Sequence, residues 1–118
     1  MPTLHLHTNV PQDETSFAEF SAKATELLSK TLKKNASYTQ VIHTPSMIVF
    51  GAQTGPSAFV NLYSAGLTQE QIDELIAPLS RLLERYVAAP PPTTYIHFHS
   101  TERARSAWNG RTLKRSGD

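Results

Sequence analysis

The chain begins with the nine residues Met1-Pro2-Thr3-Leu4-His5-Leu6-His7-Thr8-Asn9. After the proline, apolar and polar residues alternate, which is the pattern of a β-strand buried on one face. Leu4 and Leu6 would face a core, and His5 and His7 would face the opposite side. The stretch therefore predicts a strand that starts directly after a proline.

Pro2 is a candidate catalytic group, because removal of Met1 would leave a prolyl secondary amine fixed to the end of this strand. A neutral secondary amine is a good base and nucleophile. Burial or nearby positive charge lowers its pKa by disfavouring the protonated form. The alternative is that a proline after the first methionine has no chemical role. The choice depends on whether the rest of the chain supplies catalytic partners.

The composition excludes several classes of function. A chain of 118 residues is predicted to form one domain, 1–118, and its net charge of +1 argues against a nucleic-acid binder. The basic segment from Arg103 to Arg115 is interrupted by uncharged residues, and the lack of cysteine excludes disulfides and cysteine–metal sites. No apolar run suits a signal peptide or a membrane span. We therefore expect no membrane partner and a cytoplasmic location, with secretion without a signal peptide left open.

The first half of the chain reads as strand, helix and strand. Ser16 and Glu19 form a capping-box pattern at the start of an amphipathic helix, which we expect to end near Lys33-Lys34-Asn35. The segment from Tyr38 to His43 is rich in aromatic and β-branched residues. It predicts the second strand, which Pro45 should end.

The second half repeats this order. Its main strand is almost unbroken in apolar character, which is typical of a central strand covered on both faces. Thr68 and Gln71 form a second capping box ahead of an amphipathic pattern that includes Ile76, and Pro78 inside this pattern should kink the helix. The expected elements are a short strand over 47–50, a strand over 57–64, a helix that ends at Tyr86 and a strand over 95–99.

Two strand–helix–strand repeats, over about 2–50 and 56–100, therefore precede a C-terminal segment, 101–118. Each repeat requires a right-handed crossover between parallel strands. We predict the α/β (α+β) class, with a four-stranded mixed sheet and both helices on one face. The other face would carry Phe59 and Tyr63, so we expect other subunits to cover it.

Six segments stand in an informative order: Pro2, Thr8-Asn9-Val10-Pro11, Phe50-Gly51, Leu62-Tyr63-Ser64-Ala65-Gly66, Tyr95-Ile96-His97 and Trp108-Asn109. In order and spacing they resemble the macrophage migration inhibitory factor family of the tautomerase superfamily. The resemblance implies a homotrimer whose sheets form a central barrel, with active sites between neighbouring subunits and no cofactor. It also implies keto–enol tautomerisation of aromatic 2-oxo acids such as phenylpyruvate, or of dopachrome-like compounds. Some members of the family act as cytokines.

The resemblance also implies roles for single residues. Pro2 matches the catalytic base, Lys34 the active-site lysine, and Tyr95 a tyrosine contributed by the adjacent subunit. The residues that match substrate-binding positions are Tyr38, Ser64, Ala65, His97, Trp108 and Leu113. Three of these depart from the usual family residues, with a smaller alanine at 65, a histidine for an asparagine at 97 and a leucine for an aromatic residue at 113.

Two further departures bear on function. Ser57-Ala58-Phe59-Val60 stands where the family has Cys-x-x-Cys, so a thiol–disulfide activity should be absent. Gln12 replaces a loop arginine that is associated with receptor engagement in the family. This replacement weakens a cytokine role and leaves any receptor unidentified.

Tautomerisation of a 2-oxo acid needs a base beside the carbonyl, a positive group for the carboxylate and stabilisation of the enolate oxygen. Pro2 would be the base, while Lys34 would hold the carboxylate and disfavour protonation of Pro2. The residues alone leave an alternative at each position. Lys34 could be only a cation at a helix C-terminus, and Tyr95 could only pack in an interface. Trp108 could belong to the core, and Ser64 could only cap a turn.

Paired histidines raise the question of a metal site. His5 and His7 share one strand face, as do His97 and His99. The first and fourth strands would not be neighbours in this sheet, and no carboxylate or cysteine accompanies the pairs. We expect no metal site, and only His97 as a pocket residue that could respond to pH.

Two functions are compatible with these residues. The first is a cofactor-free tautomerase that uses Pro2 as its base, and the presence of Lys34 favours it. The second is a cytokine or binding protein with little physiological catalysis, for which the changed residues Ala65 and His97 leave room.

Overall fold

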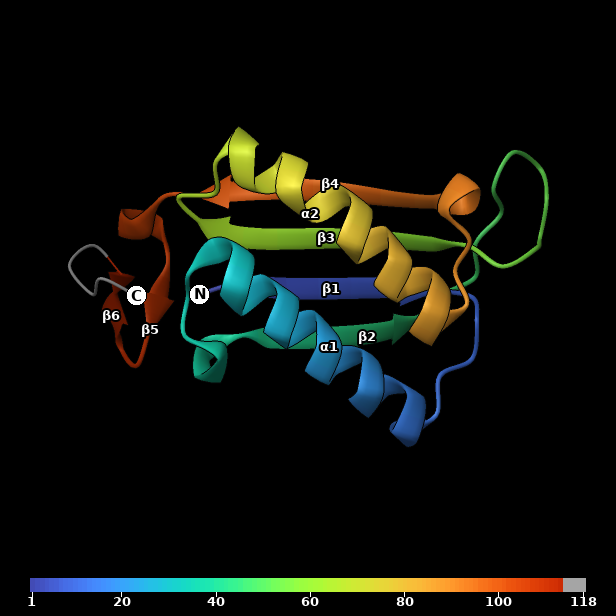
Figure 1. The fold of residues 1–118 in the computed structure, drawn as a ribbon, viewed down its shortest axis with the longest axis horizontal. Coiled ribbons are helices and arrows are strands. Elements are labelled where there is room, and N and C mark those ends of the chain that lie inside the picture. Colours follow the sequence, from blue (N-terminus) through green and yellow to red (C-terminus); the bar gives the residue numbers. More distant parts are fainter. Residues whose placement is uncertain (114–118) are drawn as a thin grey trace.

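Two strand–helix–strand units share one sheet in the computed structural model, which describes residues 1–113 (Figure 1). The elements are β1 (Thr3–Thr8), α1 (Glu14–Leu32) and β2 (Gln40–Pro45) in the first unit, and β3 (Ala58–Ala65), α2 (Gln69–Leu82) and β4 (Thr94–Thr101) in the second. Strands β1 and β2 are parallel, as are β3 and β4, and an antiparallel β1–β3 pair joins the units. The strand order is therefore β2-β1-β3-β4.

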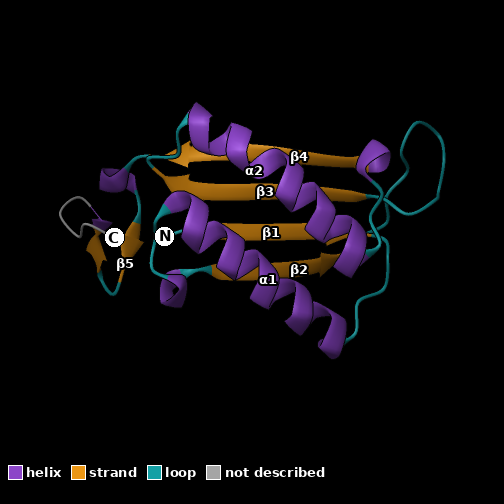
Figure 2. Cartoon of the chain, in the orientation of Figure 1, coloured by secondary structure: helices purple, strands orange, loops and turns teal. Residues whose placement is uncertain are grey.

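Both helices lie side by side on one face of this mixed sheet, which confirms the predicted fold class (Figure 2). The last part of the predicted C-terminal segment, residues 114–118 with Arg115, lies outside the described residues. Within residues 1–113, no helix combines the length and the apolar character that a membrane span requires.

The core lies between the sheet and the helices. Alternation in β1 turns Leu4 and Leu6 toward the helices, where both are fully buried. Each helix turns a stripe of apolar residues, spaced by about one helical turn, toward the sheet. The fully or nearly fully buried helical residues are Phe20, Ala24, Leu28, Leu32, Leu75, Leu79 and Leu83.

Helix α1 begins earlier than the sequence predicts. Its N-cap is Asp13, whose carboxylate accepts a hydrogen bond from the Ser16 backbone N–H at 2.7 Å, so the expected capping box at Ser16 is wrong. Asp13 takes the position because a carboxylate suits the unpaired N–H groups and the dipole of a helix N-terminus. The same N–H lowers the pKa of Asp13. The C-cap is Lys33, in the left-handed conformation, so the helix ends where the sequence predicts.

In the second unit, the predicted capping box of Thr68 and Gln71 is confirmed. The α-helix continues through Pro78 but ends at Leu82 instead of Tyr86, because the chain then forms a π-helical turn, η2 (Leu83–Val87). Ile76 was expected on the buried face, yet it is 46% exposed. The stripe toward the sheet consists of residues 75, 79 and 83, and the next residue along a helix points about 100° away.

The edge strand β2 differs most from its prediction. It begins at Gln40, because Tyr38 belongs to a short 3-10 helix, η1 (Ala36–Tyr38). It ends at Pro45, as predicted, and includes the proline itself. An edge strand tolerates a proline, since one side of the strand needs no N–H donor. The predicted strand over 47–50 is absent, and Phe50 forms only an isolated bridge with Gln53.

The second face of the sheet carries no helix in the described part of the chain (Figure 1). It presents large aromatic side chains, with Phe59 37%, Tyr63 38% and Tyr95 60% exposed. Strand β3 is central, as predicted, but in this protomer only one of its faces is covered. The expectation that other subunits cover the face stays a prediction.

Substitution of Leu79 by alanine should destabilise the fold by about 2–5 kcal/mol, because a fully buried leucine leaves a cavity between helix and sheet. The matched control is Ile76→Ala on the same helix, which should cost well under half as much because Ile76 is exposed. Urea unfolding followed by circular dichroism measures both free energies. Equal losses would contradict the packing described here.

Candidate active site

A cavity of about 400 Å³ opens at the end of the sheet where β1 begins. Three residues predicted to bind substrate, Tyr38, Trp108 and Leu113, line it together. Its other lining residues are Met1, Thr3, Ser37, Thr39, Gln40, Tyr63, Thr101, Ser106 and Ala107. A larger cavity of about 610 Å³ lies between α1 and α2 and includes none of the residues predicted for the site.

Pro2 lies directly behind the wall of the smaller cavity. It is buried, and its carbonyl accepts a hydrogen bond from the Gln40 backbone N–H at 3.0 Å. Both neighbours of Pro2 in the chain, Met1 and Thr3, are lining residues. The Pro2 nitrogen is therefore held at one place on the rim of the core, and Met1 stands between it and the cavity.

Two aromatic rings form one side of this cavity. The ring centroids of Tyr38 and Trp108 lie 5.0 Å apart, and their planes are tilted by 59°. Trp108 is placed by a hairpin of β5 (Ala107–Trp108) and β6 (Arg111–Thr112). Its turn residues Asn109 and Gly110 both have positive φ, 52° and 77°, as a tight hairpin turn requires. The Asn-Gly pair in the sequence is a signal that could have predicted this hairpin.

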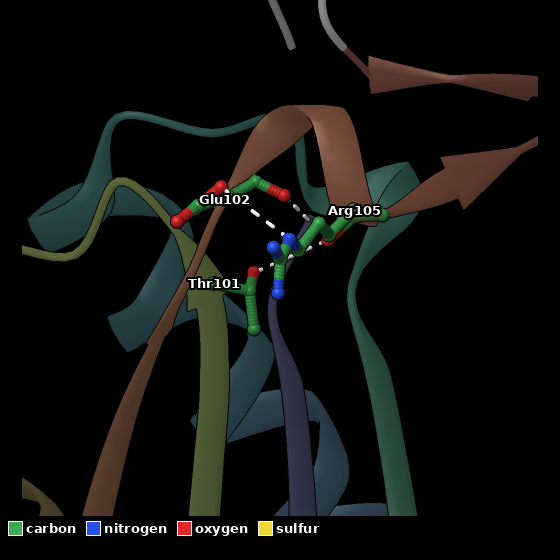
Figure 3. Close-up of polar contacts among 4 residues, drawn as sticks. Thr101, Glu102 and Arg105 are labelled. Carbon is green, nitrogen blue, oxygen red and sulfur yellow. Dashed lines mark hydrogen bonds and ion pairs between the residues drawn. The ribbon is translucent and has the colours of Figure 1, made fainter.

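Polar contacts hold the start of this C-terminal segment against the sheet (Figure 3). The Ser106 hydroxyl donates to the Thr101 hydroxyl at 3.3 Å and to the Glu102 carbonyl at 3.2 Å. The Arg105 Nε lies 3.7 Å from a Glu102 carboxylate oxygen. The backbone N–H of Leu113 then donates to the Ser106 carbonyl at 2.9 Å, and the Leu113 side chain is buried. The C-terminal segment thus supplies one part of the cavity wall, and the two repeats supply the rest.

Lys34 approaches the cavity without lining it. Its Nζ donates a hydrogen bond to the Ala65 carbonyl at 3.2 Å. Ala65 pairs in the sheet with Thr101, which is a lining residue. Ser64 is different, because it lies on the core side of β3 with its hydroxyl buried and without a hydrogen-bond partner among residues 1–113.

Tyr95 lies toward the opposite end of the sheet, and His97 lies in the middle of β4, where it pairs with Asn61. Tyr95 pairs with Phe59 in β3, whereas the residue beside the cavity, Tyr63, pairs with His99. Tyr95 and His99 are separated by four strand positions, about 13 Å along the strand. Within one protomer, Tyr95 therefore does not reach Pro2.

Tyr63 is a cavity residue that the sequence did not reveal. It pairs with Thr3 in β1, and its ring stacks on that of His99 at 4.4 Å with an interplanar angle of 14°. His99 in turn shares a 2.8 Å hydrogen bond with the side-chain oxygen of Asn61. Strand alternation predicts only the face on which Tyr63 lies. Its place beside the cavity depends on the register of β1 against β3.

The histidines of the exposed sheet face contact polar and aromatic neighbours. The His5 Nε2 lies 2.8 Å from the Thr44 hydroxyl oxygen, and the rings of His5 and His7 are 4.1 Å apart. The ring of His97 meets that of Phe59 edge-on at 5.2 Å. Among residues 1–113, no three histidine, aspartate or glutamate side chains gather as a metal site would require.

Comparison with known proteins gives one matching family model, macrophage migration inhibitory factor (MIF), over residues 1–114. No curated protein matches the chain. Among solved structures, the macrophage migration inhibitory factor of Trichinella spiralis is 28% identical with a TM-score of 0.82, over 93% of this chain and 98% of that one. That of Toxoplasma gondii is 23% identical with a TM-score of 0.87, over the same shares. Pt0534 inactivated by 2-oxo-3-pentynoate is 14% identical with a TM-score of 0.86, over 98% and 99%.

Two histidines on β1 and β2 make the stability depend on pH. Burial, and secondarily the charge of His7, lowers the pKa of both His5 and His43 from 6.5. The unfolded chain therefore takes up protons at these two sites before the folded chain does. Stability should be constant above that pH range and should fall as the pH drops through 6.5 and below.

Thermal unfolding between pH 8 and pH 5 measures this dependence. The double variant His5→Gln, His43→Gln should lose less in melting temperature over the range than the wild type does. The same loss in both proteins would show that other groups cause the dependence.

Proposed function

Because the chain belongs to the macrophage migration inhibitory factor family, we propose that it is a cofactor-independent keto–enol tautomerase of aromatic 2-oxo acids or dopachrome-like compounds. One observation carries the proposal, namely that Met1 separates the buried Pro2 from a cavity with an aromatic wall. Removal of Met1 would turn the Pro2 amide into a secondary amine facing that cavity. It would also enlarge the cavity by the volume of one methionine.

In the proposed reaction, the neutral Pro2 nitrogen takes a proton from the carbon next to the substrate carbonyl. The electrons of that C–H bond form a carbon–carbon double bond, and the π electrons of the carbonyl move to its oxygen. The same proton then returns to this oxygen to give the enol. Burial disfavours the protonated amine and so keeps Pro2 available as a base. A free α-amino group has a pKa near 8, so a modest decrease is enough at neutral pH.

The substrate's two ends would meet different surfaces. An aromatic ring would lie against the tilted pair of Tyr38 and Trp108, which can contact a flat group from two sides. The carboxylate would bind the ammonium group of Lys34, which already reaches the Ala65 carbonyl at 3.2 Å. These contacts would fix the reacting carbon beside Pro2.

We also propose that the working unit is a homotrimer in which Tyr95 and His97 of one copy complete the site of the next. The support is twofold. Tyr95 lies far from Pro2 within a protomer, and both residues belong to a sheet face whose aromatic side chains are 37–60% exposed. Association through this face would bury that apolar surface.

The direct test is the enol–keto conversion of phenylpyruvate after mass spectrometry has confirmed loss of Met1. Pro2→Gly and a form that retains Met1 should each lose at least about a hundredfold in rate, because a positioned base contributes that much. Pro56→Gly is the matched control, since Pro56 heads the second repeat and should leave the rate unchanged. Equal rates in all four proteins would favour a binding protein with little catalysis.

The shared site has a separate test in mixed assemblies. Pro2→Gly and Tyr95→Ala proteins should each be slow when alone. Refolded together, they should regain a fraction of the wild-type rate, since some sites would combine an intact Pro2 with an intact Tyr95 from the other copy. A mixture no faster than its two components would place Tyr95 outside the site.

A further inference from the structure

We propose that the groove between α1 and α2 is a second binding site, and that its ligand is a small anionic amphiphile with an apolar body and an acidic head group. The groove encloses about 610 Å³, within the range of about 300–1,000 Å³ typical of small-molecule sites. It lies in the helix layer and shares no lining residue with the cavity beside Pro2. Its function is therefore independent of the proposed tautomerase site.

The floor of the groove is apolar. Leu27 from α1 and Pro78 and Leu82 from α2 line it, and Tyr86 from the π-helical turn completes it. All four are half-buried, and the three side chains of Leu27, Leu82 and Tyr86 pack on the core with one side and face the groove with the other. A ligand that covers this floor would gain the free energy of removing apolar surface from water.

The side chains that line the groove have the same sequence spacing on both sides. The lining positions are 23, 26, 27 and 30 on α1, 78, 81 and 82 on α2, and 85 on the π-helical turn η2 that continues α2. Each set of four follows the offsets i, i+3, i+4 and i+7 of one helix face, with a leucine at i+4. The groove is thus a continuous strip between two helix faces and not a gap left at one end.

The rim is mostly positive. Four cations, Lys23, Lys30, Arg81 and Arg85, line it, against the two carboxylates of Glu26 and Glu84.

Lys30 lies 3.8 Å from Glu26, with both side chains exposed. Lys23 and Arg81 form no ion pair within residues 1–113, and the Arg85 guanidinium lies 5.4 Å from the Tyr86 ring centroid. The uncompensated charge favours an anionic head group over a neutral or cationic one.

An irregular helix end lines part of the groove. Pro78 lacks the N–H that a helix interior uses, and the Leu83 N–H is shared between the carbonyls of Leu79 and Ser80. The π-helical turn that follows brings three consecutive residues, 84 to 86, to the groove. In a regular α-helix three consecutive side chains would spread over about 200°. Turns of this kind occur often at functional sites.

The size of the groove favours a small ligand over a docked protein helix, which would need a longer strip and about 800 Å² on each partner. An extended polyanion fits poorly, because the floor offers apolar side chains where phosphates would lie. A chain of eight to twelve carbons with a carboxylate matches both the floor and the rim.

Decanoate is the probe, and decanol at the same concentration is its uncharged control. Titration of the ¹⁵N-labelled protein should shift the amide signals of residues 23–30 and 78–86, and should leave the Trp108 indole signal in place. Arg81→Glu, Arg85→Glu should weaken decanoate binding about tenfold, since two rim charges are reversed. The control Lys33→Glu, Arg105→Glu changes the net charge equally at exposed positions outside the groove and should bind as the wild type does.

Three results would overturn the proposal. One is a shift confined to Trp108 and its neighbours, which would mean that decanoate enters the cavity beside Pro2. Another is equal binding of decanol, or equal weakening by the control pair of substitutions. The third is the absence of shifts with decanoate when an acidic helical peptide does shift residues 23–30 and 78–86, which would make the groove a protein-docking surface.

Discussion

The antiparallel pairing of β1 with β3 is the constraint on which the molecule depends, because within residues 1–113 it is the only strand pair that joins the two units. Buried polar contacts fix its register at the Asn9 end. The Thr8 hydroxyl donates to the Ser57 carbonyl at 2.7 Å, and the Asn9 side chain accepts from the Ser57 N–H at 2.9 Å. A slip by one residue would leave these groups unpaired and would turn Leu4 and Leu6 away from the core.

This register also gives the two halves unequal roles. Pro2 and Pro56 head equivalent strands, and each offers its carbonyl to the strand that returns: the Gln40 N–H donates to Pro2, and the Thr93 hydroxyl donates to Pro56 at 2.6 Å. Because β1 and β3 are antiparallel, the prolines lie at opposite ends of the sheet. Among the described residues, the C-terminal hairpin that carries Trp108 meets the Pro2 end, and there Trp108 forms an aromatic wall with Tyr38.

The helix layer and the uncovered face of the sheet carry different kinds of side chains and so suit different ligands. Alternation in the strands leaves one face of the sheet aromatic and rich in histidine, while the helix faces that do not contact the core form a cationic groove with an apolar floor. Both features follow from amphipathic elements that have more than one apolar stripe. Leu27 and Leu82 illustrate this, since each contacts the core at its edge and still lines the groove.

Local patterns in the sequence determined the two repeats, the fold class, the buried stripes and the capping box at Thr68, because strand alternation, helical periodicity and caps depend on near neighbours. They also indicated Pro2, whereas Tyr38 and Trp108 were indicated by the family resemblance. Only the tertiary structure decided which of these meet, since the partners of Pro2 come from η1, β3 and the C-terminal hairpin. The edge position of β2 made Pro45 acceptable, and the stripe at 75, 79 and 83 left Ile76 exposed. Tyr63 joined the site through strand register, a long-range property that no local pattern contains.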